Sequence, residues 1–176
     1  MRKAPPTPTG CALWRPQLKT WQTLTASHAA IALYPWRRID PIPWAELARP
    51  LSESRVALVT SAGLYRPGVD QPFVKSLGGD TSHRVIPDDV DLQSLAIGQT
   101  SDAFDRAPMQ ADRNMGLPLD RLHELVSAGV VGSAAPRHVS INGSILAPGR
   151  LVRDTGPRVA DVLRADQVDA ALFVPV

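Results

Sequence analysis

The chain has 176 residues, of which 44% are hydrophobic and 20% charged, as is typical of a soluble globular protein with one core. A formal net charge of +2 is too small to indicate nucleic-acid binding. No apolar run approaches the roughly 18 residues that a membrane-spanning helix needs, and the basic start Met1–Lys3 lacks the apolar region of a signal peptide. We therefore expect a cytoplasmic protein whose partners include neither nucleic acid nor a membrane.

Residues 1–50 are expected to form an irregular Pro/Trp-rich arm. Eight of the 17 prolines fall in this stretch, and proline removes a backbone donor and breaks helices. Only residues 18–34 are free of proline for long enough to form a helix. Three of the four tryptophans, in the first 40 residues, would anchor the arm on its own domain or on a partner. The single cysteine, Cys11, has no second cysteine for an intrachain disulfide or a metal cluster.

Residues 51–176 are predicted to form an α/β domain that begins with a buried strand. The run Val56–Val59 is continuously apolar, which suits a strand covered on both faces of a parallel sheet. Residues 64–100 are rich in loop-forming pairs, with short strands expected in "HRVIP" and "SLAIGQT".

Two helix-then-strand units are predicted next. The stretch "LPLDRLHELVSAGVVG" predicts a helix that starts near Pro118 and stops at Gly129, followed by a strand in "VVGSAA". One apolar stripe on this helix would comprise Leu119, Leu122, Leu125 and Val126. "INGS", residues 141–144, predicts a tight turn. A second helix is expected from an N-cap at Asp154 or Thr155, and residues 168–174 predict the final strand.

This element order favours an open, mostly parallel sheet of the flavodoxin-like or Rossmann-like kind. In such sheets ligands bind beyond the carboxyl ends of the strands. The final strand directs its carboxyl end towards that rim, and no covering helix follows it in the sequence. We therefore expect a domain that is incomplete at its C-terminus, with an exposed sheet edge.

Several polar residues are candidates for a ligand site, although none completes a catalytic set. "VTSAG" follows a predicted strand, and its backbone amides could hold an anion there or simply form a turn. The stretch matches neither a nucleophile elbow nor a dinucleotide fingerprint. "HR" and "RH" pairs near strand ends could meet an anion or only solvent, and two aspartates in "SDAFDRAPMQADRN" could form a polar wall or cap a loop. The four histidines show no metal-ligand spacing. The predicted substrate-binding residues are Ser61, Gly63, His83, Arg84, Asp105, Asp112, Arg137 and His138.

A set of stretches in one order resembles the selenoprotein B component family of glycine, sarcosine, betaine and D-proline reductases. These stretches are "LSESRVALVTSAGLY", "GDTSHRVIP", "QADRNMGLPLDRLHELVSAGVVG", "APRHVSINGSI" and "ADQVDAALFVPV". They cover roughly residues 50 to 176, and "YPWRRIDPIPWAEL" in the arm is also similar to shorter members. Leu117, the Ile141–Asn142 pair and the histidine-free loop with Asp102 and Asp105 depart from the family, so the resemblance does not identify the substrate.

The resemblance implies a selenol- or thiol-dependent reductase that cleaves a C–N bond of an amino acid or a betaine-like molecule. Its nucleophile would come directly after the final strand, immediately beyond Val176. Because selenocysteine is encoded by UGA, which ordinary gene calling reads as a stop codon, we expect the natural protein to continue there with selenocysteine. The 176-residue form would then contain no catalytic residue and be inactive. No metal or nucleotide cofactor is implied.

The expected partners are other reductase subunits, or a second copy of the chain, and a small amine-bearing substrate. A second hypothesis belongs to a different class. In it, the chain is a non-catalytic α/β binding or assembly module, which pairs with a partner through its arm and its exposed sheet edge.

Overall fold

The computed structural model describes residues 33, 40–43, 45–101 and 104–176. The chain divides into two units, Met1–Trp44 and Ala45–Val176, and the fold given below is that of the second. Most of the predicted arm, with Cys11, its tryptophans and almost all of the helix expected over residues 18–34, lies outside the described residues.

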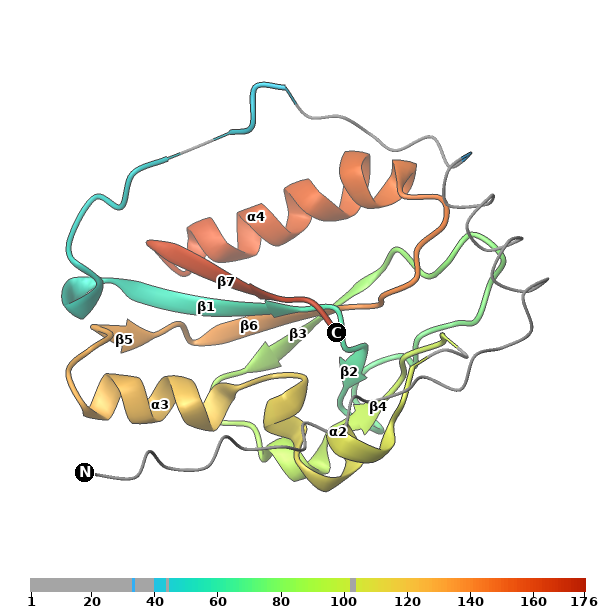
Figure 1. The fold of residues 1–176 in the computed structure, drawn as a ribbon, viewed down its shortest axis with the longest axis horizontal. Helices are drawn as coiled ribbons and strands as arrows, with labels where there is room; N and C mark the ends of the chain where they lie inside the picture. The colour runs from blue at the N-terminus through green and yellow to red at the C-terminus, as the bar shows by residue number, and fades with distance from the viewer. Residues whose placement is uncertain (1–32, 34–39, 44, 102–103) are drawn as a thin grey trace, which may run out of the picture. The chain divides into compact units, whose positions relative to one another are not determined.

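The second unit is an α/β domain with a central sheet and a separate small ladder (Figure 1). The strands are β1 (Arg55–Thr60), β2 (Leu64–Tyr65), β3 (His83–Pro87), β4 (Ala96–Ile97), β5 (Ser133–Ala134), β6 (Arg137–Ile141) and β7 (Ala170–Val174). The α-helices are α2 (Ala107–Ala111), α3 (Leu119–Ser127) and α4 (Gly156–Ala165). Short helical turns are η1 (Leu51–Glu53), η2 (Leu92–Ser94), η3 (Arg113–Met115) and the π-helical η4 (Leu151–Thr155).

Strand β1 is the centre of the sheet. Along one edge it pairs in parallel with β7, from Val56 opposite Ala170 to Thr60 opposite Val174. Along the other edge its start pairs with β5 and its end with β6, both in parallel. Strand β3 pairs antiparallel with the outer edge of β6. The sheet is therefore mostly parallel, which confirms the predicted fold class.

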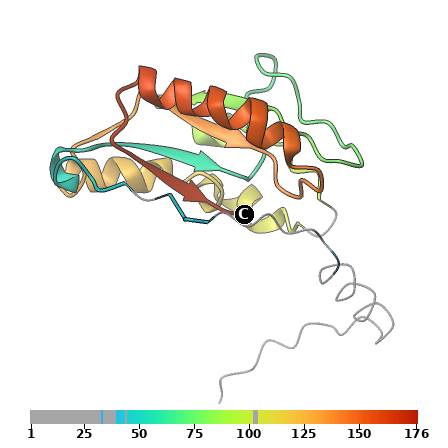
Figure 2. The ribbon, with the colours of Figure 1, turned by 90° about the horizontal axis from the view of Figure 1, so that it is seen from above.

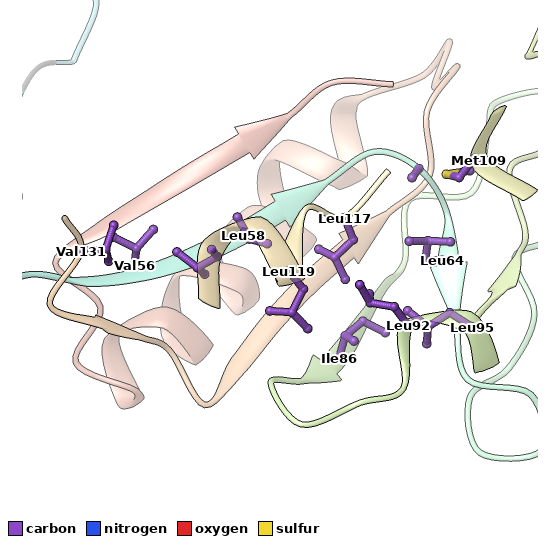
Figure 3. Packing of buried hydrophobic residues seen from close by; sticks show 12 residues of the cluster. Val56, Leu58, Leu64, Ile86, Leu92, Leu95, Met109, Leu117, Leu119 and Val131 are labelled. Carbon is purple, nitrogen blue, oxygen red and sulfur yellow. The ribbon is translucent and has the colours of Figure 1, made fainter. Parts of the chain in front are cut away.

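Helices cover both faces of this sheet, as Figures 1 and 2 show. On one face Val56 and Leu58 belong to one buried cluster with α3 residues Leu119 and Leu122 and with Met109 of α2. Figure 3 shows this cluster, with Val56 and Met109 at its opposite ends. On the other face Val59 and Val139 pack against Val159 of α4. All residues of β1 after Arg55 are buried, which explains why this strand is a continuous apolar run.

The predicted helices are present, with two corrections. Helix α3 ends as expected near Gly129, whose φ of +71° is a conformation that favours glycine. The predicted stripe was wrong at Leu125, which is 45% exposed. Thr155 makes no side-chain cap; the helical turn η4 precedes α4 without a break, and the Thr155 hydroxyl instead donates to the carbonyl oxygen of Thr81.

Strand β6 was missed by the sequence analysis. Its three central residues, His138, Val139 and Ser140, are all buried. Two of these three are polar, so the segment lacks the apolar pattern that would have identified it. Of the strand predicted in "VVGSAA", only the two residues of β5 form a strand in the structure. The chain then continues along the same edge of β1 into β6.

Strand β7 lies at an edge of the sheet, where it pairs with β1 alone among the described strands. Its neighbouring side chains point to opposite faces, and neither face is fully covered: Leu172 is 53% exposed and Phe173 is 67% exposed. The prediction of an exposed edge at the last strand is therefore confirmed. Among the described residues, no helix combines the length and the apolar character needed to cross a bilayer.

Candidate functional site

The candidate site is the carboxyl rim, where the parallel strands β1, β6 and β7 end together. Residues directly beyond these ends are in contact with each other and with the loop that follows β4. We define the carboxyl rim by Ser61, Gly63, Gln99, Thr100, Asn142, Gly143 and Val176.

Ser61 connects the ends of β1 and β7. Its backbone N–H donates to the carbonyl oxygen of Val174 at 3.1 Å, and its Oγ accepts from the backbone N–H of Val176 at 2.9 Å. This places the segment beyond β7 against the end of β1. The predicted site residue Ser61 therefore lies at the rim as a positioning group for that segment.

Gly63 lets three backbone segments come close together. Its N–H donates to the Ile141 carbonyl oxygen at 2.9 Å, and its carbonyl oxygen accepts from the Gly98 N–H at 2.8 Å. Its φ is +67°, and a Cβ placed on it would lie 2.9 Å from the backbone nitrogen of Gln99. A side chain at this position would push the ends of β1 and β6 away from the Gln99 loop.

Two buried amides, which the sequence analysis did not identify, complete the rim. Asn142 donates from Nδ2 to the Thr100 hydroxyl at 2.9 Å, while its buried Oδ1 has no partner among the described residues. Gln99 donates from Nε2 to the Ser61 carbonyl oxygen at 3.2 Å. The sequence indicates Asn142 as part of an Asn-Gly turn and of a pair that departs from the family, but not as a site residue, and Gln99 comes from a distant loop. The polar side chains of the rim are thus two neutral amides and the two hydroxyls of Ser61 and Thr100.

His83 and Arg84 start β3, which runs antiparallel, so His83 lies opposite Ile141 at the same end of the sheet. Arg84 is held by the carbonyl oxygens of Gln71 and Pro72, and its guanidinium lies 4.2 Å from the centre of the Phe73 ring. Burial, followed by the charges of Arg158 and Arg84, lowers the pKa of His83. Arg84 lines a cavity that shares no residue with the carboxyl rim.

Arg137 and His138 lie at the opposite end of the sheet from the carboxyl rim, because β6 begins there. Arg137 forms a bidentate ion pair with Asp166. His138 is fully buried; its Nδ1 accepts from the Leu58 N–H at 3.0 Å, and its Nε2 lies 2.9 Å from Asp88 Oδ1. The structure therefore does not bring this pair together with Ser61 and Gly63.

Asp105 and Asp112 cap local turns. Asp105 accepts from the Ala107 N–H at 3.0 Å, and Asp112 accepts from the Asn114 N–H at 2.8 Å. This hydrogen bond and a second one from the Asn114 side-chain amide lower the pKa of Asp112. The geometry matches the loop-capping alternative of the sequence analysis, whereas Asp102 lies outside the described residues. Within the described ranges no cluster of potential ligands could hold a metal ion.

The contribution of Ser61 can be tested directly. We expect Ser61→Ala to lower the free energy of unfolding by only about 1 kcal/mol, the usual net value of one hydrogen bond. The local effect should be larger: the Val176 amide, now without its acceptor, should exchange with solvent faster in NMR hydrogen-exchange measurements. Ser94→Ala, which removes a hydroxyl bonded to Asp91, should leave Val176 exchange unchanged. Equal Val176 exchange in wild type and Ser61→Ala would contradict the positioning role.

Comparison with known proteins shows which family this sequence resembles. The sequence model of "Glycine/sarcosine/betaine reductase selenoprotein B" matches residues 28–175. The chain is 31% identical over 136 residues to the D-proline reductase subunit gamma of Acetoanaerobium sticklandii, covering 77% of this chain and 54% of that protein. It is 26% identical over 142 residues to the glycine reductase complex component B subunit gamma of Symbiobacterium thermophilum, covering 80% of this chain and 32% of that protein.

The chain thus spans about half the length of the first of these relatives and about a third of the second. No solved structure matches it significantly. The family match extends over most of the chain, from within the N-terminal unit to the segment beyond β7. The resemblance seen in the sequence is confirmed, and the chain belongs to the glycine/sarcosine/betaine reductase selenoprotein B family.

Proposed function

We propose that the chain is a component of a selenol- or thiol-dependent reductase complex that cleaves a C–N bond of an amino acid or a betaine-like substrate. The observation that carries this proposal is the convergence of β1, β6 and β7 on one rim, where Ser61 holds the segment beyond β7. Support also comes from the two relatives, which are named as a subunit of D-proline reductase and a subunit of glycine reductase component B.

In this proposal a selenolate or thiolate is presented at the carboxyl rim, beyond β7. It attacks the substrate carbon that carries nitrogen, so a carbon–selenium or carbon–sulfur bond forms as the C–N bond breaks. The nitrogen leaves with the bonding electron pair and takes up a proton. A dithiol on another subunit then supplies two electrons and becomes a disulfide. The carbon–selenium or carbon–sulfur bond breaks, the carbon takes up a proton and leaves as the reduced product, and the selenolate or thiolate is regenerated. The role of this chain is to fix the nucleophile-bearing segment through Ser61 and the closely packed Gly63.

The test uses the complex as the cell makes it. The gene is tagged at the amino end in its own cells, and the purified complex is assayed with glycine, sarcosine, betaine and D-proline, with a dithiol as electron donor. We expect amine release, or ring opening for proline, that stops after alkylation of the reduced complex with iodoacetamide. Absence of activity towards all four substrates, or activity unaffected by alkylation, would count against the proposal.

A matched variant tests where the nucleophile is. Cys11→Ser removes the single cysteine of the sequence, which lies outside the described residues. We expect the variant complex to keep full activity and full sensitivity to alkylation, because the proposed nucleophile lies beyond β7. Loss of activity in Cys11→Ser would assign the chemistry to Cys11 and overturn this part of the proposal.

The second candidate function is a non-catalytic assembly module. It is favoured by the edge of β7, where Leu172 and Phe173 are exposed on opposite faces of the sheet. An exposed apolar edge strand is a surface to which another chain can add a strand. Recovery of a stable complex that has no reductase activity would support this alternative.

A further inference from the structure

The cavity lined by Arg84 lies beside the sheet, between residues 71–84 and the helical segment formed by η4 and α4. Its volume is about 600 Å³, within the range of small-molecule sites. Three arginines line it, Arg84 from the start of β3 and Arg150 and Arg158 from the helical segment. None of its lining residues belongs to the carboxyl rim, so it is independent of the proposed function.

Two of these arginines lack partners, unlike most arginines of the domain. Neither Arg150 nor Arg158 forms a hydrogen bond or ion pair with any described residue. By contrast, an aspartate or glutamate pairs with each of Arg49, Arg66, Arg121, Arg137 and Arg164. Arg150 is also the N-cap residue of η4, at the end of the helical segment where the helix dipole disfavours a cation. An anion in the cavity would compensate for this arrangement.

Arg84 is already oriented for such an anion. Its guanidinium donates to the carbonyl oxygens of Gln71, Pro72 and His83 and to the Ser82 hydroxyl. These four hydrogen bonds use four of its five N–H groups, so one N–H is left and the side chain loses little freedom on binding. An arginine fixed in this way supplies directional recognition of a carboxylate or phosphate.

The cavity also contains two carboxylates, Asp80 and Asp154. The Asp80 oxygens already accept from the Val74 N–H and from the N–H and hydroxyl of Ser82. These hydrogen bonds and the charge of Arg84 lower the pKa of Asp80 against the opposing effect of burial. Asp154 is exposed and makes no hydrogen bond with a described residue. The three arginines still leave the cavity with one net positive charge.

From these observations we propose that the cavity between residues 71–84 and the η4–α4 segment binds the oxyanion group of a small molecule, a carboxylate or a phosphate, through Arg84, Arg150 and Arg158.

The experiment is an NMR titration of the full chain with inorganic phosphate and, separately, with acetate, at constant ionic strength. We expect saturable shifts of the Gly79, Ser82 and Thr155 amides, which lie around the cavity. Saturation by phosphate alone assigns a phosphate-bearing ligand, and comparable saturation by acetate assigns a carboxylate. Absence of saturable shifts with both anions would overturn the proposal.

Variants distinguish anion binding in this cavity from nonspecific attraction of anions to positive charge. Arg158→Ala should weaken binding at least tenfold, the usual effect of losing a charged hydrogen bond. Arg153→Ala removes the same charge from the same helical segment, but Arg153 does not line the cavity, so binding should change less than twofold. Asp154→Asn removes a repelling carboxylate and should tighten binding. Equal weakening by Arg158→Ala and Arg153→Ala, or weaker binding in Asp154→Asn, would contradict the assigned site.

Discussion

Gly63→Ala is expected to lower the free energy of unfolding by about 3 kcal/mol or more. A φ of +67° costs a non-glycine residue about 1–2 kcal/mol. The added Cβ would also lie 2.9 Å from the Gln99 backbone nitrogen and 3.1 Å from Asn142 Oδ1. The first contact is with backbone, which cannot move aside by a side-chain rotation. Urea denaturation followed by circular dichroism measures the change.

Gly68→Ala is the matched control for this prediction. Gly68 has a similar φ of +76°, but no atom lies within 4 Å of a Cβ placed there. Gly68→Ala should lower the free energy of unfolding by only about 1–2 kcal/mol, the cost of placing a non-glycine residue in this backbone conformation. The difference between the two variants therefore isolates the close approach at the carboxyl rim. Equal destabilisation by the two variants would show that the rim can relax around a side chain.

Gly63→Ala should also alter the rim as a site. Gly63 lies between the end of β1 and the Gln99 loop, and Asn142 Oδ1 is the nearest side-chain atom. Movement of that loop would disturb the Gln99 hydrogen bond to Ser61, and with it the segment held beyond β7. In the purified complex we expect lower kcat for Gly63→Ala than for Gly68→Ala, at temperatures where both variants are folded.

The sequence predicted those parts of the fold that depend on local pattern. The apolar run Val56–Val59 identified the central strand, because a strand buried on both faces has to be apolar throughout. The same pattern does not identify strand β6, because two of its buried residues, His138 and Ser140, are polar. Burial of His138 is possible because Leu58 and Asp88 satisfy both ring nitrogens, and that pairing joins residues far apart in the sequence.

The candidate site was predicted only in part, for a topological reason. The pairs His83–Arg84 and Arg137–His138 look alike in the sequence, and both were assigned to one anionic site. Because β3 runs antiparallel to β6, His83 lies opposite Ile141 whereas Arg137 lies opposite Pro87. The two pairs are therefore at opposite ends of the sheet. The direction of β3 depends on long-range pairing, which no local pattern in "HRVIP" encodes.

His138→Leu is expected to lower the free energy of unfolding by about 2–4 kcal/mol. Leucine fills a similar volume but leaves the Leu58 N–H, in the central strand, without its acceptor. It also removes one of the two donors to Asp88 Oδ1, the other being His123. A buried polar group left unpaired costs about 1–3 kcal/mol. His123→Leu is the matched control: it removes the other donor to Asp88, but its side chain is 43% exposed, so its cost should stay below about 1 kcal/mol.

The same histidine should make folding stability dependent on pH. Nδ1 of His138 accepts from Leu58, so the folded protein holds the neutral ring, with Nε2–H donating to Asp88. Burial lowers the pKa of His138, against the opposing effect of Asp88 and with a small further lowering by His123. Below about pH 6.5 the unfolded chain therefore binds more protons than the folded chain. The free energy of unfolding keeps the full contribution of His138 above that pH and falls as the pH decreases below it.

Urea titrations between pH 7.5 and pH 5 should reveal this dependence, with a slope of at most about 1.4 kcal/mol per pH unit for one proton. The pKa of His83 is also lowered, so it contributes a slope of the same sign. The pKa values of Asp70, Asp80 and Asp112 are lowered from 3.8, so these carboxylates stay ionised in this window. The free energy of unfolding should therefore depend less steeply on pH in His138→Leu than in wild type. The slope that remains in the variant is the contribution of His83. An unchanged slope would mean that folded and unfolded chains protonate His138 equally, which its bond to the Leu58 N–H does not allow.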